Sequence, residues 1–299
     1  MRFPDLLIIG GMKCGSTSLY RDLGTHPRVF FPIDKEPENL ADERVRTDAG
    51  RAEYAAMFDG ATQDQLCAEA STLYSKRPLS EGTAERAREV CGDDLRIIYV
   101  VREPLSRVRS HHHHEFTEGL LPADPDEAVR RHPSLLDYTR YAMQAEPWID
   151  ALGAERVRIV RFEDYTKARA ETTADLQAWL GLEPKPELVQ VDQVFNKSDG
   201  KPVMTGGWRA VRQNPVYDKI VRPLLSQAVK DRLRAVLLPK AKNDRRPMSP
   251  ETAKHILDTL ADDHEKLRTI MGLDAPVWDR DAALAKARAA YDAHASGGA

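Results

Sequence analysis

Short apolar runs alternate with more polar segments over about the first 180 residues of the chain. The apolar runs predict buried strands, and they cover residues 6–9, 29–31, 66–70, 95–101 and 157–161. Segments of helical composition lie between them, at residues 17–23, 51–58, 81–90, from 104 onward and 165–180. This alternation predicts an α/β fold with a doubly wound parallel sheet flanked by helices, in which ligands bind beyond the carboxyl ends of the strands.

Strand patterns end near residue 202, and the remaining sequence is helical with polar connections. Residues 240–250 are the most loop-like stretch, rich in charge and proline, and a linker, a lid and a substrate rim all fit them. We expect one domain over residues 1–299. Its α/β nucleotide-binding core would cover about residues 1–200, and a mostly helical lid and acceptor-side portion about residues 201–299.

Composition narrows the class of protein. The chain has 299 residues, of which 41% are hydrophobic, so it can build a sizeable core. Lys and Arg number 44 against 47 Asp and Glu, which gives no overall attraction to nucleic acid. Three cysteines without C-x-x-C spacing argue against a disulfide framework and a zinc site. We therefore expect a cytoplasmic protein with no nucleic-acid partner and no membrane span, of unspecified oligomeric state.

The turn after the first strand carries the strongest chemical signal. Residues 10–19 read G-G-M-K-C-G-S-T-S-L and join a strand to a helix, as phosphate-binding turns do. A nucleoside-triphosphate loop would have Lys after its second glycine, but Ser16 stands there and the cation is Lys13. This arrangement suits a mixed anhydride that needs no Mg²⁺ bridge. The expected donor-binding residues of this turn are Lys13, Cys14, Gly15, Ser16, Thr17 and Ser18.

The K-x-G-S-T sequence at 13–17 resembles the K-x-G-T-T loop of sulfotransferases that use 3′-phosphoadenosine 5′-phosphosulfate (PAPS). The likeness extends to H-P-x-V at 26–29, to R-F-E-D-Y at 161–165 and to a closing Trp278. The resemblance implies a distantly P-loop-like fold and PAPS as the sulfuryl donor. It also implies 3′,5′-bisphosphoadenosine (PAP) as the product and no required metal.

Two further segments resemble the family's contacts to the 3′-phosphate. Residues 102–110 fit R-x-P-x-x-R-x-x-S, which places Arg102 at the end of a strand and Ser110 about two helical turns later. A forked guanidinium and a hydroxyl at this spacing can clamp a dianion. The sequence F-N-K-S-D-G-K at 195–201 resembles the late loop that closes on the 3′-phosphate and adenine. There Gly200 would allow close backbone approach, and Lys201 would add charge.

Glu36 is the candidate catalytic base, because sulfuryl transfer needs a group that takes the acceptor proton. Residues 35–40 read K-E-P-E-N-L and resemble the K-E-P-x-x-[FL] element of carbohydrate-type sulfotransferases, whose Glu is the proposed base. Lys13 and Glu36 are therefore the expected catalytic residues. The S-T-L-Y sequence at 71–74 resembles the family's [ST]-P-x-Y element, with Thr72 in place of the proline. Ser71 and Tyr74 are candidate substrate or donor contacts.

The run of four histidines at 111–114 leaves alternatives open. One of them could be the base, as in cytosolic members of the family, and histidines at i and i+3 could bind a metal. Our first interpretation is an exposed run that lines the acceptor cleft.

The resemblance implies sulfuryl transfer from PAPS to a hydroxyl or amine of a small-molecule, lipid or carbohydrate acceptor by in-line displacement. Two alternatives remain. A P-loop small-molecule kinase with an altered loop would require Mg²⁺ and a carboxylate at the end of a strand. A non-catalytic nucleotide-binding protein would share the fold without turnover. The sequence does not identify the acceptor.

Overall fold

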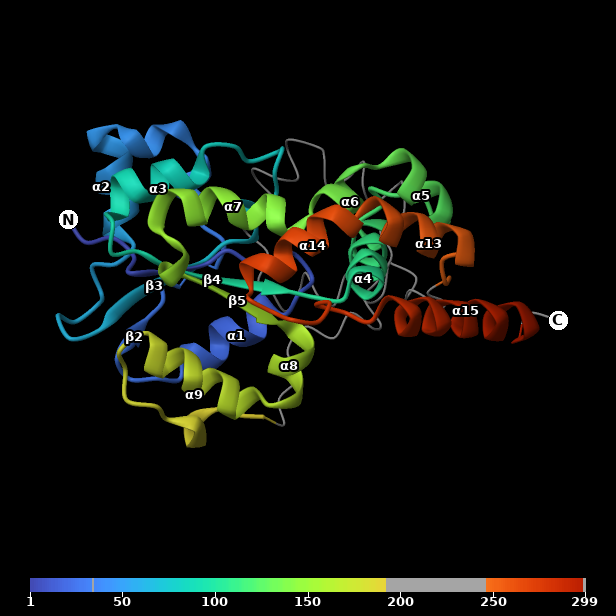
Figure 1. Ribbon diagram of the computed structural model, residues 1–299. Coiled ribbons are helices and arrows are strands. Elements are labelled where there is room, and N and C mark those ends of the chain that lie inside the picture. Colours follow the sequence, from blue (N-terminus) through green and yellow to red (C-terminus); the bar gives the residue numbers. More distant parts are fainter. Residues whose placement is uncertain (34, 192–245, 298–299) are drawn as a thin grey trace, which may run out of the picture. The chain divides into compact units, whose positions relative to one another are not determined.

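The computed structural model describes residues 1–33, 35–191 and 246–297, and these residues form two compact units (Figure 1). The first unit contains described residues 1–107, 136–191 and 256–279. The second contains described residues 108–135, 246–255 and 280–297. The sheet and the glycine-rich turn lie in the first unit.

Five parallel strands form one sheet in the order β2-β3-β1-β4-β5. They are β1 (Leu6–Ile8), β2 (Val29–Phe30), β3 (Leu66–Ala70), β4 (Arg96–Val101) and β5 (Val157–Arg161). In the register of the central strand, Leu7 lies between Glu69 of β3 and Ile97 of β4. The five strands predicted from apolar runs are confirmed. Because β3 lies between β2 and β1, the segments that follow these three strands meet at one edge of the sheet.

Helices of the first unit cover both faces of the sheet, as Figure 1 shows. One face carries α1 (Ser16–Leu23), α8 (Phe162–Lys167) and α9 (Arg169–Trp179). The other carries α2 (Asp48–Ala56), α3 (Thr83–Cys91), α7 (Tyr141–Leu152) and α14 (Ala261–Ile270). Short 3-10 turns are η1 (Asn39–Ala41), η2 (Glu43–Arg46), η3 (Thr72–Ser75), η4 (Ala154–Arg156) and η5 (Pro186–Leu188). The sheet is therefore doubly wound, as predicted.

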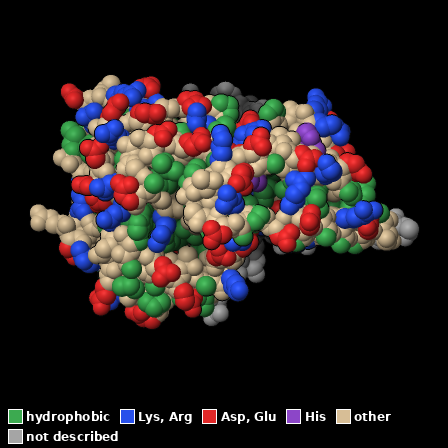
Figure 2. All heavy atoms as spheres, viewed as in Figure 1, with side chains coloured by type: hydrophobic (Ala, Val, Ile, Leu, Met, Phe, Trp, Pro, Cys, Tyr) green, Lys and Arg blue, Asp and Glu red, His purple; other side chains and the backbone are tan. Residues whose placement is uncertain are grey.

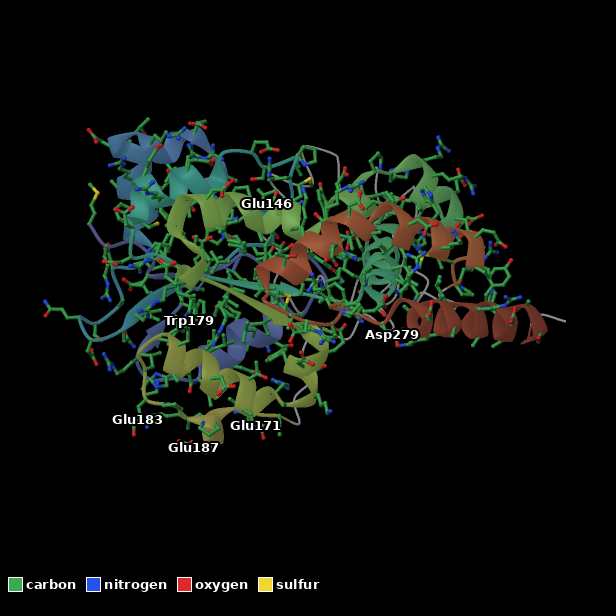
Figure 3. The ribbon with its side chains drawn as sticks, in the orientation of Figure 1. Glu146, Glu171, Trp179, Glu183, Glu187 and Asp279 are labelled. Carbon is green, nitrogen blue, oxygen red and sulfur yellow. The ribbon has the colours of Figure 1, made fainter. Side chains whose placement is uncertain are left out.

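The core forms where β1 and β4 are covered on both faces. All three residues of β1 are fully buried, and so are Ile97, Ile98 and Tyr99 of β4, which explains why these strands read as continuous apolar runs. On the face of the sheet that carries α9, the guanidinium groups of Arg96 and Arg158 lie near the ring of Trp179 (Figure 3). Their Cζ atoms are 5.8 and 5.9 Å from the ring centre. Arg96 of β4 and Arg158 of β5 thus pack against this helix through their guanidinium groups.

The helices of the structure differ from the predicted ones at two places. The single helix expected at 165–180 is two helices, α8 and α9, separated at Ala168, whose φ of −137° and ψ of 61° are not helical. The sequence pattern also gave no signal for α7, a 12-residue helix with Pro147 inside it. This helix is covered by α14, whose Asp263 caps its start by accepting from Ala142 N (3.1 Å) and Met143 N (2.9 Å).

The described part of the second unit is helical. It contains most of α4 (Pro104–Thr117), α5 (Pro125–Arg131), the start of α6 (Ser134–Asp137), part of α13 (Pro250–Thr259) and α15 (Arg280–Gly297). Asp126 of α5 accepts from Ser249 N at 3.0 Å, just before α13. Among the described residues, no helix combines the length and apolar character needed to cross a membrane. Basic and acidic side chains are intermixed on the face seen in Figure 2.

Candidate active site

The glycine-rich turn opens the N-terminus of α1 toward the carboxyl edge of the sheet. Gly15 is the N-cap, with a φ of +90° and no side chain to occupy the cap position. A Cβ at Gly15 would lie 2.7 Å from the ring of Phe162, so both conformation and space require glycine there. The first amides of a helix have no intrahelical acceptor and carry partial positive charge, which makes this turn an anion site.

The turn is anchored to β4 from below. Gly11 N donates to Val100 O at 2.7 Å, and Cys14 N donates to Gly11 O at 2.9 Å. Lys13 adopts a φ of +69°, which is unfavourable for a residue with a side chain. The Cys14 thiol is buried, and burial raises its pKa to about 11. Cys14 therefore stays a neutral thiol that packs inward beside the Tyr141 hydroxyl, 3.9 Å away.

Arg102 lies against the same turn. It follows β4 directly, and its Nη1 donates to Lys13 O at 3.0 Å. The guanidinium also stacks over Phe162, 4.6 Å from the ring centre. Tyr141 Oη donates to Arg102 O at 2.7 Å and holds its backbone from α7. The structure thus brings together the two cationic positions that the sequence predicted separately.

Arg107, the second arginine of the R-x-P-x-x-R-x-x-S motif, supports the turn from inside. Its side chain is fully buried, with Nε donating to Met12 O at 3.2 Å and Nη1 to Thr139 Oγ1 at 2.9 Å. The R-x-P-x-x-R-x-x-S motif therefore has two kinds of arginine. Arg102 is half-buried at the edge of the sheet, and Arg107 is buried beneath the glycine-rich turn and supports it. Ser110 lies further along α4, in the second unit, and its contact with a 3′-phosphate stays a prediction.

Two carboxylates fix the peptide that carries Arg102. Glu163 accepts from Glu103 N at 2.9 Å through one oxygen and from Trp278 Nε1 at 3.2 Å through the other. Glu103 in turn accepts from Leu105 N (2.9 Å) and Ser106 N (2.8 Å), which caps the start of α4. Glu163 of the R-F-E-D-Y element and the closing Trp278 thus hold the site in place.

The base segment, which we define as residues 35–39, follows β2 and lies across the end of β3. Glu36 N donates to Ala70 O at 3.0 Å. Glu36 Oε2 accepts from Thr72 Oγ1 at 3.2 Å, and Lys35 Nζ contacts Oε1. The Glu36 side chain is 36% exposed, so an acceptor can reach it.

Backbone strain concentrates in the glycine-rich turn and in the base segment. Among the described residues, the non-glycine residues with positive φ are Lys13 (+69°), Glu36 (+64°) and Glu38 (+61°). Such conformations cost about 1–3 kcal/mol each and persist where surrounding contacts impose them, often at functional sites. Two of the three residues are the expected catalytic pair. Glu38 had no sequence signal, and burial raises its pKa.

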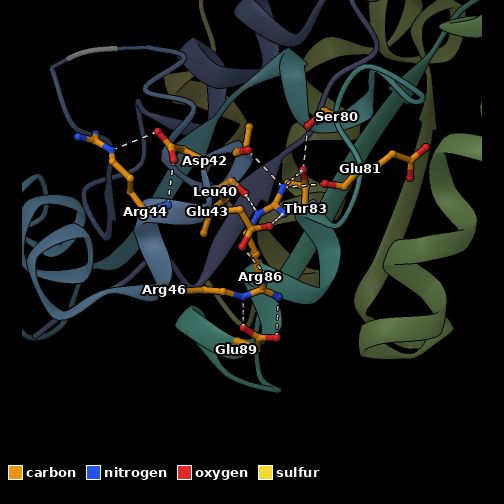
Figure 4. A network of polar contacts seen from close by, with 11 residues as sticks. Leu40, Asp42, Glu43, Arg44, Arg46, Ser80, Glu81, Thr83, Arg86 and Glu89 are labelled. Atoms are coloured by element: carbon orange, nitrogen blue, oxygen red, sulfur yellow. Dashed lines mark hydrogen bonds and ion pairs between the residues drawn. The ribbon is translucent and has the colours of Figure 1, made fainter.

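A buried arginine fixes the chain beyond the base segment (Figure 4). Arg86 of α3 donates through Nε to Leu40 O at 2.7 Å, through Nη1 to Glu43 Oε1 at 2.6 Å and through Nη2 to Glu81 O at 2.8 Å. Only 4% of this residue is exposed. Arg86 thus ties η1 and η2 to α3, and no pattern in the sequence indicated this role.

A buried polar cluster lies under the base segment. Glu69 of β3 accepts from Ser71 Oγ at 2.7 Å and from the Tyr54 hydroxyl, and burial raises its pKa. Tyr74 Oη accepts from Leu40 N at 3.1 Å. Ser71 and Tyr74, which the sequence offered as substrate contacts, are 1% and 2% exposed. They support the base segment from below.

The histidine run differs from our first interpretation. His111, His112 and His113 are buried, so the expectation of an exposed run was wrong. His111 Nε2 lies 2.8 Å from Glu115 Oε1, and His112 Nε2 lies 2.8 Å from Pro122 O. Burial lowers the pKa of His112. In the described part of the chain, no group of three or more His, Cys, Asp or Glu side chains is arranged to hold a metal.

Some predicted residues cannot be compared with the structure. Gly200 and Lys201, the predicted late loop, lie outside the described residues, as do residues 240–245 of the predicted polar loop. Residues 246–249 have no regular secondary structure, and α13 begins at Pro250.

Comparisons with known proteins agree with this architecture. The model of the sulfotransferase family matches residues 4–186. A sulfotransferase from Alicyclobacillus acidocaldarius is structurally similar, with 21% identity, a TM-score of 0.61, and 92% of this chain and 98% of that chain covered. The sulfotransferase domain from the curacin biosynthetic pathway has 20% identity and a TM-score of 0.52, with 87% and 99% covered.

A search of curated proteins by sequence gave no match. The two structural neighbours share the fold at low identity, whereas the family match spans well over half of the 299 residues. The matched region includes the glycine-rich turn, the base segment and Arg102, the parts from which the site is built. This chain belongs to the sulfotransferase family and is an enzyme of sulfuryl transfer.

Proposed function

We propose that this enzyme transfers a sulfuryl group from PAPS to a hydroxyl or amine of a small-molecule, lipid or carbohydrate acceptor. The observation that carries the proposal is the hydrogen bond between Arg102 Nη1 and Lys13 O, 3.0 Å long. It places the Arg102 guanidinium against the main chain of the glycine-rich turn at one edge of the sheet, where a single donor with phosphates on the 5′ and 3′ carbons of its ribose could contact both. The base segment lies at the same edge, across β3.

The donor would be held at two places. Lys13, the amides of Gly15, Ser16 and Thr17, and the hydroxyls of Ser16, Thr17 and Ser18 would bind the 5′-phosphosulfate at the start of α1. Cys14 would contribute through the shape of the turn, because its amide donates to Gly11 O. Arg102 would bind the 3′-phosphate as a forked donor, with Ser110, Gly200 and Lys201 as further contacts. Arg102 suits this role because stacking on Phe162 and the bond to Lys13 O hold its guanidinium in one orientation.

The reaction would be an in-line displacement at sulfur. The acceptor O–H or N–H gives its proton to Glu36, and the acceptor atom forms a new bond to sulfur. The bond between sulfur and the bridging oxygen of the donor breaks, and its electron pair stays on the 5′-phosphate of the departing PAP. Lys13 would neutralise the charge that grows on this phosphate, which is the group's expected contribution to rate. No step requires a metal.

A hollow beside the base segment offers a place for the acceptor. It has a volume of about 840 Å³, and its walls include Pro37, Glu38 and Asn39 from the base segment. Half-buried Met57 and Leu73 add apolar surface. Such a mixture of apolar walls and a few polar groups is typical of small-molecule sites.

The kinase alternative has one specific point against it. A kinase would use a carboxylate at the end of a strand to hold Mg²⁺, and Glu69 occupies such a position on β3. Both of its oxygens instead accept hydrogen bonds, from Tyr54 and Ser71, and the residue is 1% exposed. The carboxylate therefore serves the packing under the base segment.

Calorimetry with PAP and with ATP, each with and without Mg²⁺, tests the donor. Tight binding of PAP without metal supports the proposal, whereas a strict requirement for Mg²⁺ and ATP would favour the kinase. Transfer of a ³⁵S-labelled sulfuryl group from PAPS to a panel of phenols, long-chain alcohols, amino sugars and oligosaccharides tests the acceptor. Release of labelled sulfate into water reports turnover even where no panel member reacts.

The variant Glu36→Gln separates the enzyme from a pure binder. We expect turnover to fall by about 10²–10⁴, because the variant cannot take the acceptor proton. PAP binding should stay within about twofold, since Glu36 touches no expected donor residue. Glu171→Gln, exposed on α9, is the matched control and should retain turnover. Full turnover in Glu36→Gln would reassign the base.

A further inference from the structure

Thr72 stands where the family's sequence element has a proline, and its side chain makes two contacts that a proline cannot combine. It is the first residue of η3, directly beyond the carboxyl end of β3, and is 6% exposed. Its hydroxyl donates to Glu36 Oε2 at 3.2 Å. Since Lys35 Nζ contacts Oε1, both oxygens of the candidate base are held from different sides.

The methyl group of Thr72 faces the glycine-rich turn at residues 10–19, which we call the donor loop. A Cβ placed on Gly10 would lie 3.0 Å from Thr72 Cγ2, so this methyl packs directly against the first glycine of the turn. Gly10 has a φ of +93°, and Ser75 Oγ, one turn further along η3, donates to Ile9 O at 2.6 Å. The two ends of η3 are therefore fixed to the residues that directly follow β1.

We propose that Thr72 is a positioning residue that sets the Glu36 carboxylate at a fixed distance from the donor loop. One side chain touches both the base and the loop, so a displacement of either is transmitted to the other. This inference rests on the proposed function, because Thr72 acts through Glu36. Its role is orientation: misplacement of a reacting group by about 1 Å can lower the rate by as much as a hundredfold.

The base segment needs such an external restraint. Glu36 and Glu38 hold left-handed backbone conformations on either side of Pro37, and Glu36 is partly exposed. The base segment is also held through its own backbone. Glu36 N donates to Ala70 O at 3.0 Å, and Glu38 N donates to Ser71 Oγ at 3.4 Å. These bonds fix the main chain and leave the side-chain rotamer of Glu36 to Lys35 and Thr72.

The test uses Thr72→Val, which removes the hydroxyl but keeps the shape, and Thr72→Ser, which keeps the hydroxyl. Each is made in the full chain with native Glu36 and with Glu36→Gln. PAP affinity is measured by calorimetry, and kcat by transfer of ³⁵S from PAPS to the acceptor panel and to water. Thr269→Val is the matched control, because this exposed hydroxyl donates to Glu265 O in α14.

We expect Thr72→Val to lower kcat about tenfold, the loss expected for one hydrogen bond to a charged group, with PAP affinity within about twofold. Thr72→Ser should restore most of kcat. With Glu36→Gln present, Thr72→Val should have no further effect, because the group that it positions is already inactive. Thermal unfolding of every variant shows whether the fold is retained.

Three results would overturn the inference: an unchanged kcat in Thr72→Val, an equal fall in PAP affinity, or the same loss of kcat with Glu36→Gln present. The first would show that the hydroxyl is dispensable, and the others that Thr72 has only a packing role. These outcomes differ from a failure of the proposed function. If PAP does not bind the native chain, or Glu36→Gln keeps full turnover, the proposed donor or base is wrong whatever Thr72 does.

Discussion

The donor loop and the base segment lie at the same edge of the sheet but are built in different ways. The donor loop is short in sequence, rests on β1 and β4, and is held by Arg102 and by the fully buried Arg107. The base segment is held by single contacts from Ala70 at the end of β3 and from Ser71 and Thr72 just beyond it. Arg86 holds the chain that follows. Its candidate base is partly exposed.

This difference matches the expected demands on the two sides. A donor that is the same in every reaction cycle favours a rigid, preformed anion site. An acceptor side must admit a molecule that varies between members of a family, so only the base itself needs strict orientation. We therefore expect changes to the donor loop to affect donor binding and turnover together, and changes around the base segment to affect turnover alone.

The largest effect is expected for Lys13→Gln. Loss of the charge next to the leaving phosphate should lower kcat by about 10²–10³, as removal of one preorganised stabilising group does elsewhere. Labelled sulfuryl transfer from PAPS measures it, and calorimetry with PAP should show weaker binding as well. Lys167→Gln, exposed on α8, is the control. Wild-type turnover in Lys13→Gln would remove this residue from the reaction.

Arg107→Met tests the support of the donor loop. Met12 O and Thr139 Oγ1 would lose a buried donor, at a cost of about 1–3 kcal/mol each in the free energy of unfolding. PAP affinity should fall about tenfold because the loop relaxes. Urea unfolding and calorimetry measure the two effects. Arg88→Met, which removes an exposed guanidinium from α3, should change neither.

Arg86→Met is the counterpart on the base side. Arg86 is almost as buried as Arg107 and also donates to backbone carbonyls, which belong to Leu40 and Ala41 of η1. We expect kcat to fall about tenfold and PAP affinity to stay within about twofold, because only the base segment shifts. Equal losses of PAP affinity in the Arg86 and Arg107 variants would end the distinction between the two regions.

The smallest effect is expected for Glu69→Gln and concerns stability. Burial raises the pKa of Glu69 above its ordinary 4.5, so the folded protein binds this proton more tightly than the unfolded chain does. Its contribution to the free energy of unfolding is therefore full below pH 4.5 and is lost as the pH rises through the raised pKa. Urea unfolding at pH 5 and pH 8 should show a smaller difference for Glu69→Gln than for the native protein. An unchanged difference would show that other groups dominate.

Much of the fold and the donor side could be predicted from the sequence because the signals are local. The strands appear as apolar runs since a parallel sheet is buried on both faces. The glycine-rich turn needs a left-handed glycine at position 15, and Arg102 follows a strand end directly. Each of these features is specified within about ten residues.

The remainder depends on contacts between distant segments. Thr72 reaches Glu36 only because β3 lies beside β2 in the sheet, and residue spacing does not reveal that order. The inward role of Arg107 was hidden because a motif position does not specify whether a side chain faces solvent or core. Helix α7 was missed because Pro147 interrupts its helical pattern. The burial of His111, His112 and His113 depends on packing between segments, which the polar character of histidine does not reveal.

The covering of α7 by the C-terminal segment limits how the protein can be shortened. His264 stacks on Tyr141, with ring centres 5.8 Å apart, and Trp278 lies 5.6 Å from the same ring. Tyr141 holds the backbone of Arg102, and Trp278 holds Glu163. A recombinant fragment cut at residue 186, where the family match stops, would lack these partners. Chimaeras built by exchanging the first 186 residues between relatives must therefore bring residues 256–279 from the same parent.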